Sequence, residues 1–145
     1  MNKKGVTLLE LIIVMVIIGI GAVLLAPNIT NWLPNYRLRG ATRDVVSTLR
    51  TAQIKAVTTN MQYRVSFTPG TGSAASYILQ RNSGGWINEG GTSTLPSGIT
   101  MTVSGGNDKL FNPDSTSSTG SITLSGGKGT KRITFTTATG RINIE

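Results

Sequence analysis

The chain has 145 residues, a formal net charge of +8, and neither cysteine nor histidine. This composition excludes disulfides and thiolate sites, and it removes both the commonest metal ligand and the usual general base near neutral pH. We therefore predict no catalytic residues, no cofactor site and no metal site. The length suffices for one small domain plus one membrane helix.

The first predicted element is an apolar helix over residues 6–26, which is interrupted only by Thr7, Glu10, Gly19 and Gly21. A helix of this length spans roughly 30 Å, about the thickness of the hydrocarbon core of a bilayer. Lys3 and Lys4 precede the run, so the positive-inside rule predicts a cytoplasmic N-terminus and an exported remainder.

The boundary before this helix differs from that of a secretory signal peptide. Such a signal has an apolar core of about 7–15 residues followed by a small-residue cleavage site, and here the run is longer and no A-x-A site follows it. The conspicuous small residue is Gly5, which lies before the run. Cleavage there would leave the apolar helix on the mature protein and create an α-amino group on Val6, close in sequence to Glu10.

A second helical pattern follows two prolines. Pro27 and Pro34 should kink or break a continuing helix. From Leu38 to about Asn60 the apolar residues recur at steps of three and four, which predicts an amphipathic helix. Its apolar stripe consists of Leu38, Ala41, Val45, Leu49, Ala52 and Ala56. We predict that the apolar run and this stripe form one long, bent helix whose exported half packs on a sheet.

Beyond Asn60 the apolar period changes to two. Tyr63, Val65 and Phe67 alternate with polar residues, which predicts a half-buried strand. Further short strands are predicted at "SYILQR", "GGWIN", "GITMTV", "SITL", "KRITFTT" and "RINIE", with glycine-rich turns between them. We also predict that Trp86 is a core aromatic. The fold class is therefore α+β.

The leader "MNKKG", joined to "VTLLELIIVMVIIGI", resembles the class III signal of type IV prepilins and type II secretion pseudopilins. The resemblance implies that a membrane prepilin peptidase cuts after Gly5 and methylates the new amine of Val6. In that family a glutamate is the fifth mature residue, as Glu10 would be here, whereas phenylalanine usually stands where this chain has Val6. The segments "STLRTAQIKAVTTNMQYRVSF" and "ITFTTATGRINIE" look like the GspH/FimT group of minor pilins and pseudopilins.

This resemblance implies a type IV pilin-like fold, in which a long N-terminal helix packs through its amphipathic half on a small antiparallel β-sheet head. We expect a leader peptide at residues 1–5, a transmembrane and filament-core helix at 6–34, and an amphipathic helix plus globular head at 35–145. The implied partners are other pilin or pseudopilin subunits, the prepilin peptidase and an inner-membrane assembly platform. The expected location is the bacterial inner membrane, with the head in the periplasm and the subunit in a filament after assembly.

Glu10 has two readings within this expectation. A charge at mid-bilayer costs on the order of 2.5–3.5 kcal/mol. Pairing with the α-amino group of Val6 on a neighbouring subunit would offset part of that cost and fix the axial register of packed helices. Alternatively, the side chain snorkels to the nearby cytoplasmic headgroups and has no partner.

The C-terminal segment is rich in basic residues, namely Lys128, Lys131, Arg132 and Arg141. Together they could neutralise phosphates and bind DNA in a salt-dependent way. Some FimT-like proteins bind DNA through a C-terminal Gly-Arg-x-Arg stretch, and Gly140 and Arg141 match it whereas Asn143 replaces the second arginine. DNA is therefore a candidate partner, and the alternative is a solvated basic edge that aids solubility.

Overall fold

The computed structural model describes residues 5–127, 129–137 and 139–145, without the side chains of residues 24–31. The chain divides into two compact units, Met1–Leu33 and Pro34–Glu145. One helix, α1, runs from Leu8 to Thr59 and contributes to both units. Neither Pro27 nor Pro34 ends it, because a proline removes a single backbone donor and the hydrogen-bond ladder resumes on both sides.

The head half of α1 buries the predicted stripe. All six of its residues are between 0 % and 4 % exposed. Val46 and Thr42 are buried beside them, and the Thr42 hydroxyl donates a hydrogen bond of 2.7 Å to the Leu38 carbonyl oxygen. That bond satisfies the hydroxyl within the helix, so a polar residue is tolerated in the buried face.

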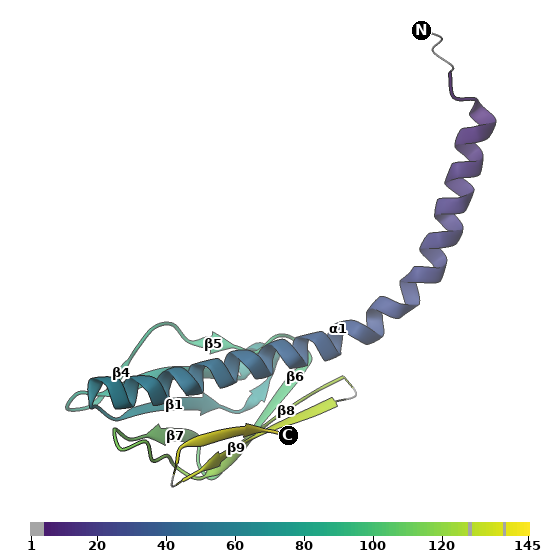
Figure 1. The fold of residues 1–145 in the computed structure, drawn as a ribbon. Coiled ribbons are helices and arrows are strands. Elements are labelled where there is room, and N and C mark those ends of the chain that lie inside the picture. The colour runs from purple at the N-terminus through teal and green to yellow at the C-terminus, as the bar shows by residue number, and fades with distance from the viewer. Residues whose placement is uncertain (1–4, 128, 138) are drawn as a thin grey trace. The chain divides into compact units, whose positions relative to one another are not determined.

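The head contains two antiparallel five-stranded sheets, where the sequence predicted one small sheet (Figure 1). Sheet A has the order β4-β3-β1-β7, with β5 also pairing with β3. Its strands are β1 (Tyr63–Thr68), β3 (Ser76–Asn82), β4 (Trp86–Asn88), β5 (Ser93–Thr94) and β7 (Asp108–Phe111). Sheet B has the order β10-β9-β8-β6-β2. Its strands are β2 (Gly70–Thr71), β6 (Ile99–Ser104), β8 (Gly120–Gly126), β9 (Gly129–Thr136) and β10 (Arg141–Ile144).

The two sheets and the helix share one hydrophobic core. The inward residues of the strands alternate as predicted, and they include Val65, Phe67, Met101, Ile122, Leu124 and Ile133. Phe111 of sheet A and Phe135 of sheet B meet edge-to-face, with ring centroids 6.4 Å apart. Each fully buried aliphatic or aromatic side chain contributes roughly 1.5–3 kcal/mol, so this core provides the main stabilisation of the head. The α+β class and the pilin-like arrangement of helix on antiparallel sheet are confirmed.

Trp86 is not a core residue, and the prediction that it is one is wrong. It begins the three-residue strand β4 at the edge of sheet A and is only half-buried. The Arg64 guanidinium carbon lies 4.2 Å from its ring centroid. Trp86 therefore covers the outside of the sheet through a cation–π contact, which a period-two pattern cannot distinguish from core packing.

Candidate functional site

The N-terminal site residues lie at the start of α1. Gly5 and Val6 precede the helix, and Val6 is 73 % exposed. The Glu10 backbone N–H donates to the Thr7 carbonyl oxygen at 3.1 Å and to the Thr7 hydroxyl at 3.3 Å. Thr7 therefore caps the helix, and Glu10 occupies the third position after that cap. The T-x-x-E spacing is a capping-box signature that the sequence-based prediction did not include, and the bond to the Thr7 hydroxyl comes from the Glu10 backbone.

The helix that follows this cap is apolar on every side. From Leu8 to Val23 its large hydrophobic side chains are between 49 % and 76 % exposed. An unbroken exposed run from Leu11 to Ile18 covers all directions around the axis, because successive residues turn by about 100°. A helix of this kind is stable in an apolar environment, such as lipid or other apolar helices. Across the described residues, which exclude the side chains of 24–31, no helix is both long enough and apolar enough to cross a membrane.

The structure separates the four basic residues of the C-terminal segment. Lys131 and Arg132 are neighbours on β9, so their side chains point to opposite faces of sheet B. Arg141 pairs with Thr136, and this places Arg141 on the face that Arg132 occupies. Both arginines are exposed, whereas Lys131 is half-buried. Lys128 lies outside the described residues.

The face that Arg132 and Arg141 share is otherwise made of small hydroxyl side chains. Its members on β6, β8 and β9 are Thr100, Thr102, Ser104, Ser121, Thr123, Ser125, Thr130, Thr134 and Thr136. Glu145 lies opposite Arg132, and their backbones exchange hydrogen bonds of 3.0 and 2.8 Å. This face is therefore flat and polar, with two cations and one nearby acid.

Gly140, the first residue of the Gly-Arg match, has a structural reason to be glycine. Its φ is +58°, and a Cβ there would lie 2.6 Å from the Ser115 carbonyl oxygen and 2.8 Å from the Gln53 amide nitrogen. The turn between β9 and β10 therefore requires glycine whether or not the head binds a nucleic acid.

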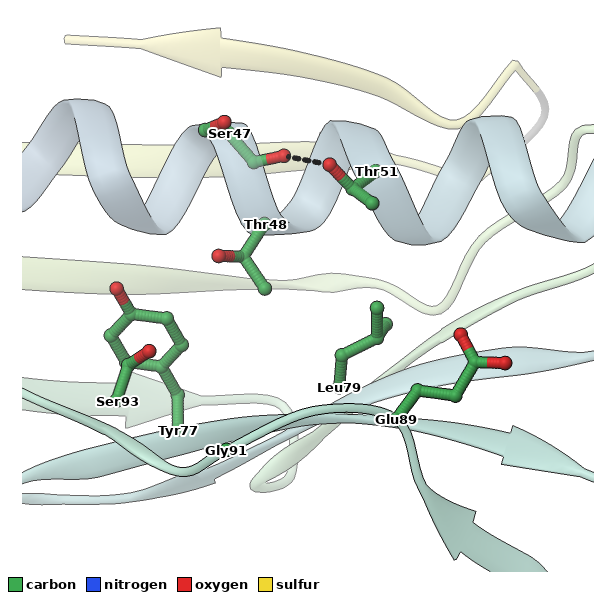
Figure 2. A pocket seen from close by; sticks show the side chains of 8 residues that line it. All are labelled: Ser47, Thr48, Thr51, Tyr77, Leu79, Glu89, Gly91 and Ser93. Atoms are coloured by element: carbon green, nitrogen blue, oxygen red, sulfur yellow. Dashed lines mark hydrogen bonds between the residues drawn. The ribbon is translucent and has the colours of Figure 1, made fainter.

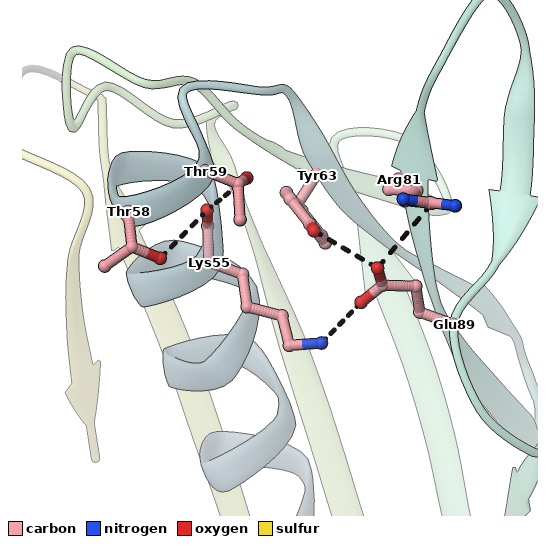
Figure 3. Close-up of polar contacts among 6 residues, drawn as sticks. All are labelled: Lys55, Thr58, Thr59, Tyr63, Arg81 and Glu89. Atoms are coloured by element: carbon pink, nitrogen blue, oxygen red, sulfur yellow. Dashed lines mark hydrogen bonds and ion pairs between the residues drawn. The ribbon is translucent and has the colours of Figure 1, made fainter.

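A polar cluster joins the end of α1 to sheet A (Figure 3). Glu89 accepts a 2.5 Å hydrogen bond from the Lys55 ammonium and a 3.2 Å hydrogen bond from the Tyr63 hydroxyl. The Arg81 Nε atom lies 3.7 Å from the same carboxylate. The hydrogen bond from Lys55 is the main cause of a lowered pKa at Glu89, and it raises the pKa of Lys55. The cluster is a structural ion-pair network, since both basic side chains pair with the same carboxylate.

A cavity of about 210 Å³ lies between α1 and sheet A (Figure 2). Its lining residues are Ser47, Thr48, Thr51, Tyr77, Leu79, Glu89, Gly91 and Ser93. Glu89, the acid among them, is engaged by Lys55, and burial raises the pKa of the Tyr77 hydroxyl. The carboxylate of this lining is therefore committed to an ion pair, and Asp44 borders the adjoining hollow beside Thr48 and Tyr77. Within the described residues there is also no group of three acidic side chains that could hold a metal ion.

A protein-family match covers the leader and most of the apolar part of α1. Residues 1–26 match the prokaryotic N-terminal methylation motif. This motif is characteristic of the prepilin leader of type IV pilins and pseudopilins. It implies processing by a prepilin peptidase and assembly with other pilin subunits, and it indicates an inner-membrane precursor. Comparison with curated proteins and with solved structures gives no significant match.

Proposed function

We propose that the protein is a structural, non-enzymatic subunit of a type IV pilus or a type II secretion pseudopilus. The observation that carries this proposal is the apolar surface of Leu8–Val23, which is exposed on all sides and lies within the methylation motif at residues 1–26. A helix that is apolar all round is stable in lipid or among other apolar helices, and a filament subunit occupies both environments in turn. The α+β head on the second half of α1 agrees with this role.

Several finer features belong to the same proposal. The subunit would be a single-pass protein with a cytoplasmic N-terminus and a periplasmic head, held by residues 6–34. It would resemble the GspH/FimT group and engage an inner-membrane assembly platform. The basis is the order of the chain, in which Lys3 and Lys4 precede the apolar run and the β-rich head follows it.

Cleavage between Gly5 and Val6 is the first step of this proposal. Gly5 lies in open space, with no heavy atom within 4 Å of the position of a Cβ, so the boundary is accessible to a peptidase. Intact-mass analysis of the protein from cells with an active prepilin peptidase should show a chain that starts at a methylated Val6. Retention of Met1 in such cells would contradict the proposal.

Glu10 would pair with the α-amino group of Val6 on a neighbouring subunit. This role can be tested cleanly, because glutamine leaves the bond from the backbone N–H of residue 10 to the Thr7 hydroxyl in place and removes the charge. Glu10→Gln should reduce the abundance of the subunit in sheared filaments relative to the membrane fraction. The control Thr7→Ala removes the cap and keeps the charge, and it should leave incorporation near normal. Normal incorporation of Glu10→Gln together with failure of Thr7→Ala would assign Glu10 to the helix cap alone.

DNA capture is a second candidate, and it has a narrower basis than the sequence indicated. Arg132 and Arg141 are exposed on one face of sheet B, surrounded by hydroxyl side chains that can also contact phosphates. Binding would be weak, insensitive to sequence and lowered by salt, and each phosphate contact removed should reduce the salt slope by about 0.9. Titration of the full chain with duplex DNA tests it: Arg141→Ala should weaken binding, whereas the control Lys131→Ala, on the opposite face, should not. Absence of wild-type binding at low salt would leave only the filament role.

A further inference from the structure

A groove of about 410 Å³ lies between the head half of α1 and strand β10. Its lining residues are Arg43, Val46, Ser47, Arg50, Thr51, Ile54 and Ile144. Figure 1 shows the yellow C-terminal strand lying along α1, in agreement with the contribution of Ile144 to this lining. Ile54 is 62 % exposed and Ile144 is 47 % exposed. The groove therefore has an apolar floor that the head itself leaves open.

Two arginines at the groove have no acidic partner among the described residues. No ion pair joins Arg43 or Arg50 to a carboxylate there, although the head contains several acids. Glu89 is held by Lys55, and Asp108 is held by Arg64 at 2.7 Å. Both arginines are exposed at the groove, so their guanidinium groups are available to pair with an acidic ligand.

The groove also borders an open sheet edge. Strand β10 ends the order of sheet B, so no described strand pairs with its outer side. Glu145 and Arg132 exchange both backbone hydrogen bonds, and antiparallel pairing alternates such pairs with pairs that do not bond. The backbone groups of Ile142 and Ile144 therefore point away from β9, toward the space beside α1. An edge of this kind is a template for another strand.

We propose that this groove binds an extended acidic–aliphatic peptide segment of another protein, which adds to β10 as a further strand of sheet B. The strand would bond to the free backbone groups of Ile142 and Ile144. Its inward side chains would be a carboxylate, an aliphatic residue and a second carboxylate. The carboxylates pair with Arg43 and Arg50, and the aliphatic side chain packs between them on the groove floor.

The spacing of the arginines sets the spacing in the ligand. Arg43 and Arg50 are separated by about 10.5 Å along the axis of α1. Inward residues four apart on a strand are separated by about 13 Å, a difference that long arginine side chains accommodate. The ligand pattern is therefore acid-x-aliphatic-x-acid. No two acidic residues of this chain are four apart, so a second copy cannot supply the pattern and the partner is a different protein.

The test measures fluorescence polarisation of a labelled, end-capped peptide containing Glu-Thr-Val-Thr-Glu, with the full chain kept in a non-ionic detergent. Saturable binding is expected, and the matched peptide with glutamine at both acidic positions should bind at least tenfold more weakly. The variant Arg43→Gln/Arg50→Gln should reduce affinity about tenfold, as expected for the loss of two partly exposed ion pairs. The control Arg39→Gln removes an exposed arginine of the same helix that does not line the groove, and it should change nothing.

Backbone methylation of the peptide separates strand addition from simple charge attraction. One peptide carries N-methyl groups on the residues that face β10, and its partner carries them on the alternate residues. Strand addition predicts that one of the two peptides loses binding and the other keeps it. Equal binding of both, equal binding of the glutamine peptide, or no binding by the parent peptide would each overturn the proposal. Binding of anionic vesicles or duplex DNA that depends on Arg43 and Arg50, without peptide binding, would assign the groove to those ligands instead.

Discussion

The two halves of α1 differ in how their apolar residues are placed. Between Leu38 and Ala56 the apolar residues form a narrow stripe, and all six members of that stripe are buried against the sheets. Between Leu8 and Val23 the apolar residues surround the helix, and their large side chains are exposed. The first half therefore carries hydrophobic surface on every side that the head does not use, whereas the second half buries its stripe in the head and leaves Ile54 and Val57 exposed outside that stripe.

The two halves also differ in the size of their apolar side chains. Three of the six stripe residues are alanines, and these small side chains let the helix backbone approach the strands closely. The exposed half contains mostly leucine, isoleucine, valine and methionine, with Gly19 and Gly21 toward its end. Large flexible side chains on all sides suit packing in lipid or among similar helices, where no single direction is preferred. We infer that the buried stripe of the second half is a folding surface and that the exposed apolar surface of the first half is an assembly surface.

The largest expected effect comes from a large-to-small change in each half. Leu49→Ala should lower the free energy of unfolding of the head by about 2–5 kcal/mol, because it leaves a cavity in a fully buried site. Ile13→Ala, the matched change in the exposed half, should leave that free energy unchanged. Urea denaturation of both variants, followed by tryptophan fluorescence, measures the difference. A loss of stability in Ile13→Ala similar to that in Leu49→Ala would show that the exposed half also stabilises the head.

A glycine-to-alanine change in the head should give a smaller loss of stability. Gly120 has a φ of +134°, and a Cβ there would overlap the Ser104 carbonyl oxygen and the Lys109 ammonium. Lys109 is fully buried and donates hydrogen bonds of 2.8 Å to the carbonyl oxygens of Ser104 and Gly106. Gly120→Ala should therefore cost about 2–3 kcal/mol, through backbone strain and displacement of this lysine.

Gly19→Ala is the matched change in the exposed half of α1. No heavy atom lies within 4 Å of the position of its Cβ, and alanine favours a helix over glycine. Thermal unfolding of the head should be unchanged in this variant and lowered in Gly120→Ala. Equal melting temperatures for the two variants would show that the loop around Lys109 is not part of the cooperative unit.

The smallest effect is electrostatic and depends on pH. Glu89→Gln should lower stability by about 0.2–1 kcal/mol at neutral pH, because the ion pairs of Glu89 are partly exposed. The pKa of Glu89 is lowered in the folded head, so its contribution is present above the ordinary carboxyl value of 4.5 and is lost as pH falls through the lower folded value. Between pH 7 and pH 3, the free energy of unfolding should fall less steeply in the variant than in the wild type. Urea denaturation at each pH measures it. Parallel curves of stability against pH would show that Glu89 does not contribute to the pH dependence.

Sequence patterns predicted the elements that have a strong period. The stripe of α1, the alternation at Tyr63, Val65 and Phe67, and the terminal hairpin are all present in the structure. Strands β2 and β5 were missed because each has only two residues, too few to show alternation. Strand β7 was missed because its pattern starts with Asp108 and with Lys109, a lysine whose burial depends on carbonyl groups of the loop just before the strand.

The candidate site was predictable to a different degree at each end of the chain. Gly5, Val6 and Glu10 lie in a local motif, so their identity could be read from neighbouring residues. The grouping of basic residues in the C-terminal segment depended on strand register, which assigns Lys131 and Arg132 to opposite faces. The groove beside β10 combines residues far apart in the sequence, and no local pattern indicates it.

The most direct test of the central claim compares the full chain with a fragment of residues 34–145. If the exposed half of α1 is an assembly surface alone, the head contains everything that its fold requires. In the same non-ionic detergent, the fragment and the full chain should show cooperative urea transitions with the same midpoint and the same free energy of unfolding. A fragment that unfolds without cooperativity, or that is less stable by about 2 kcal/mol or more, would show that the N-terminal half contributes to the fold and would contradict the account.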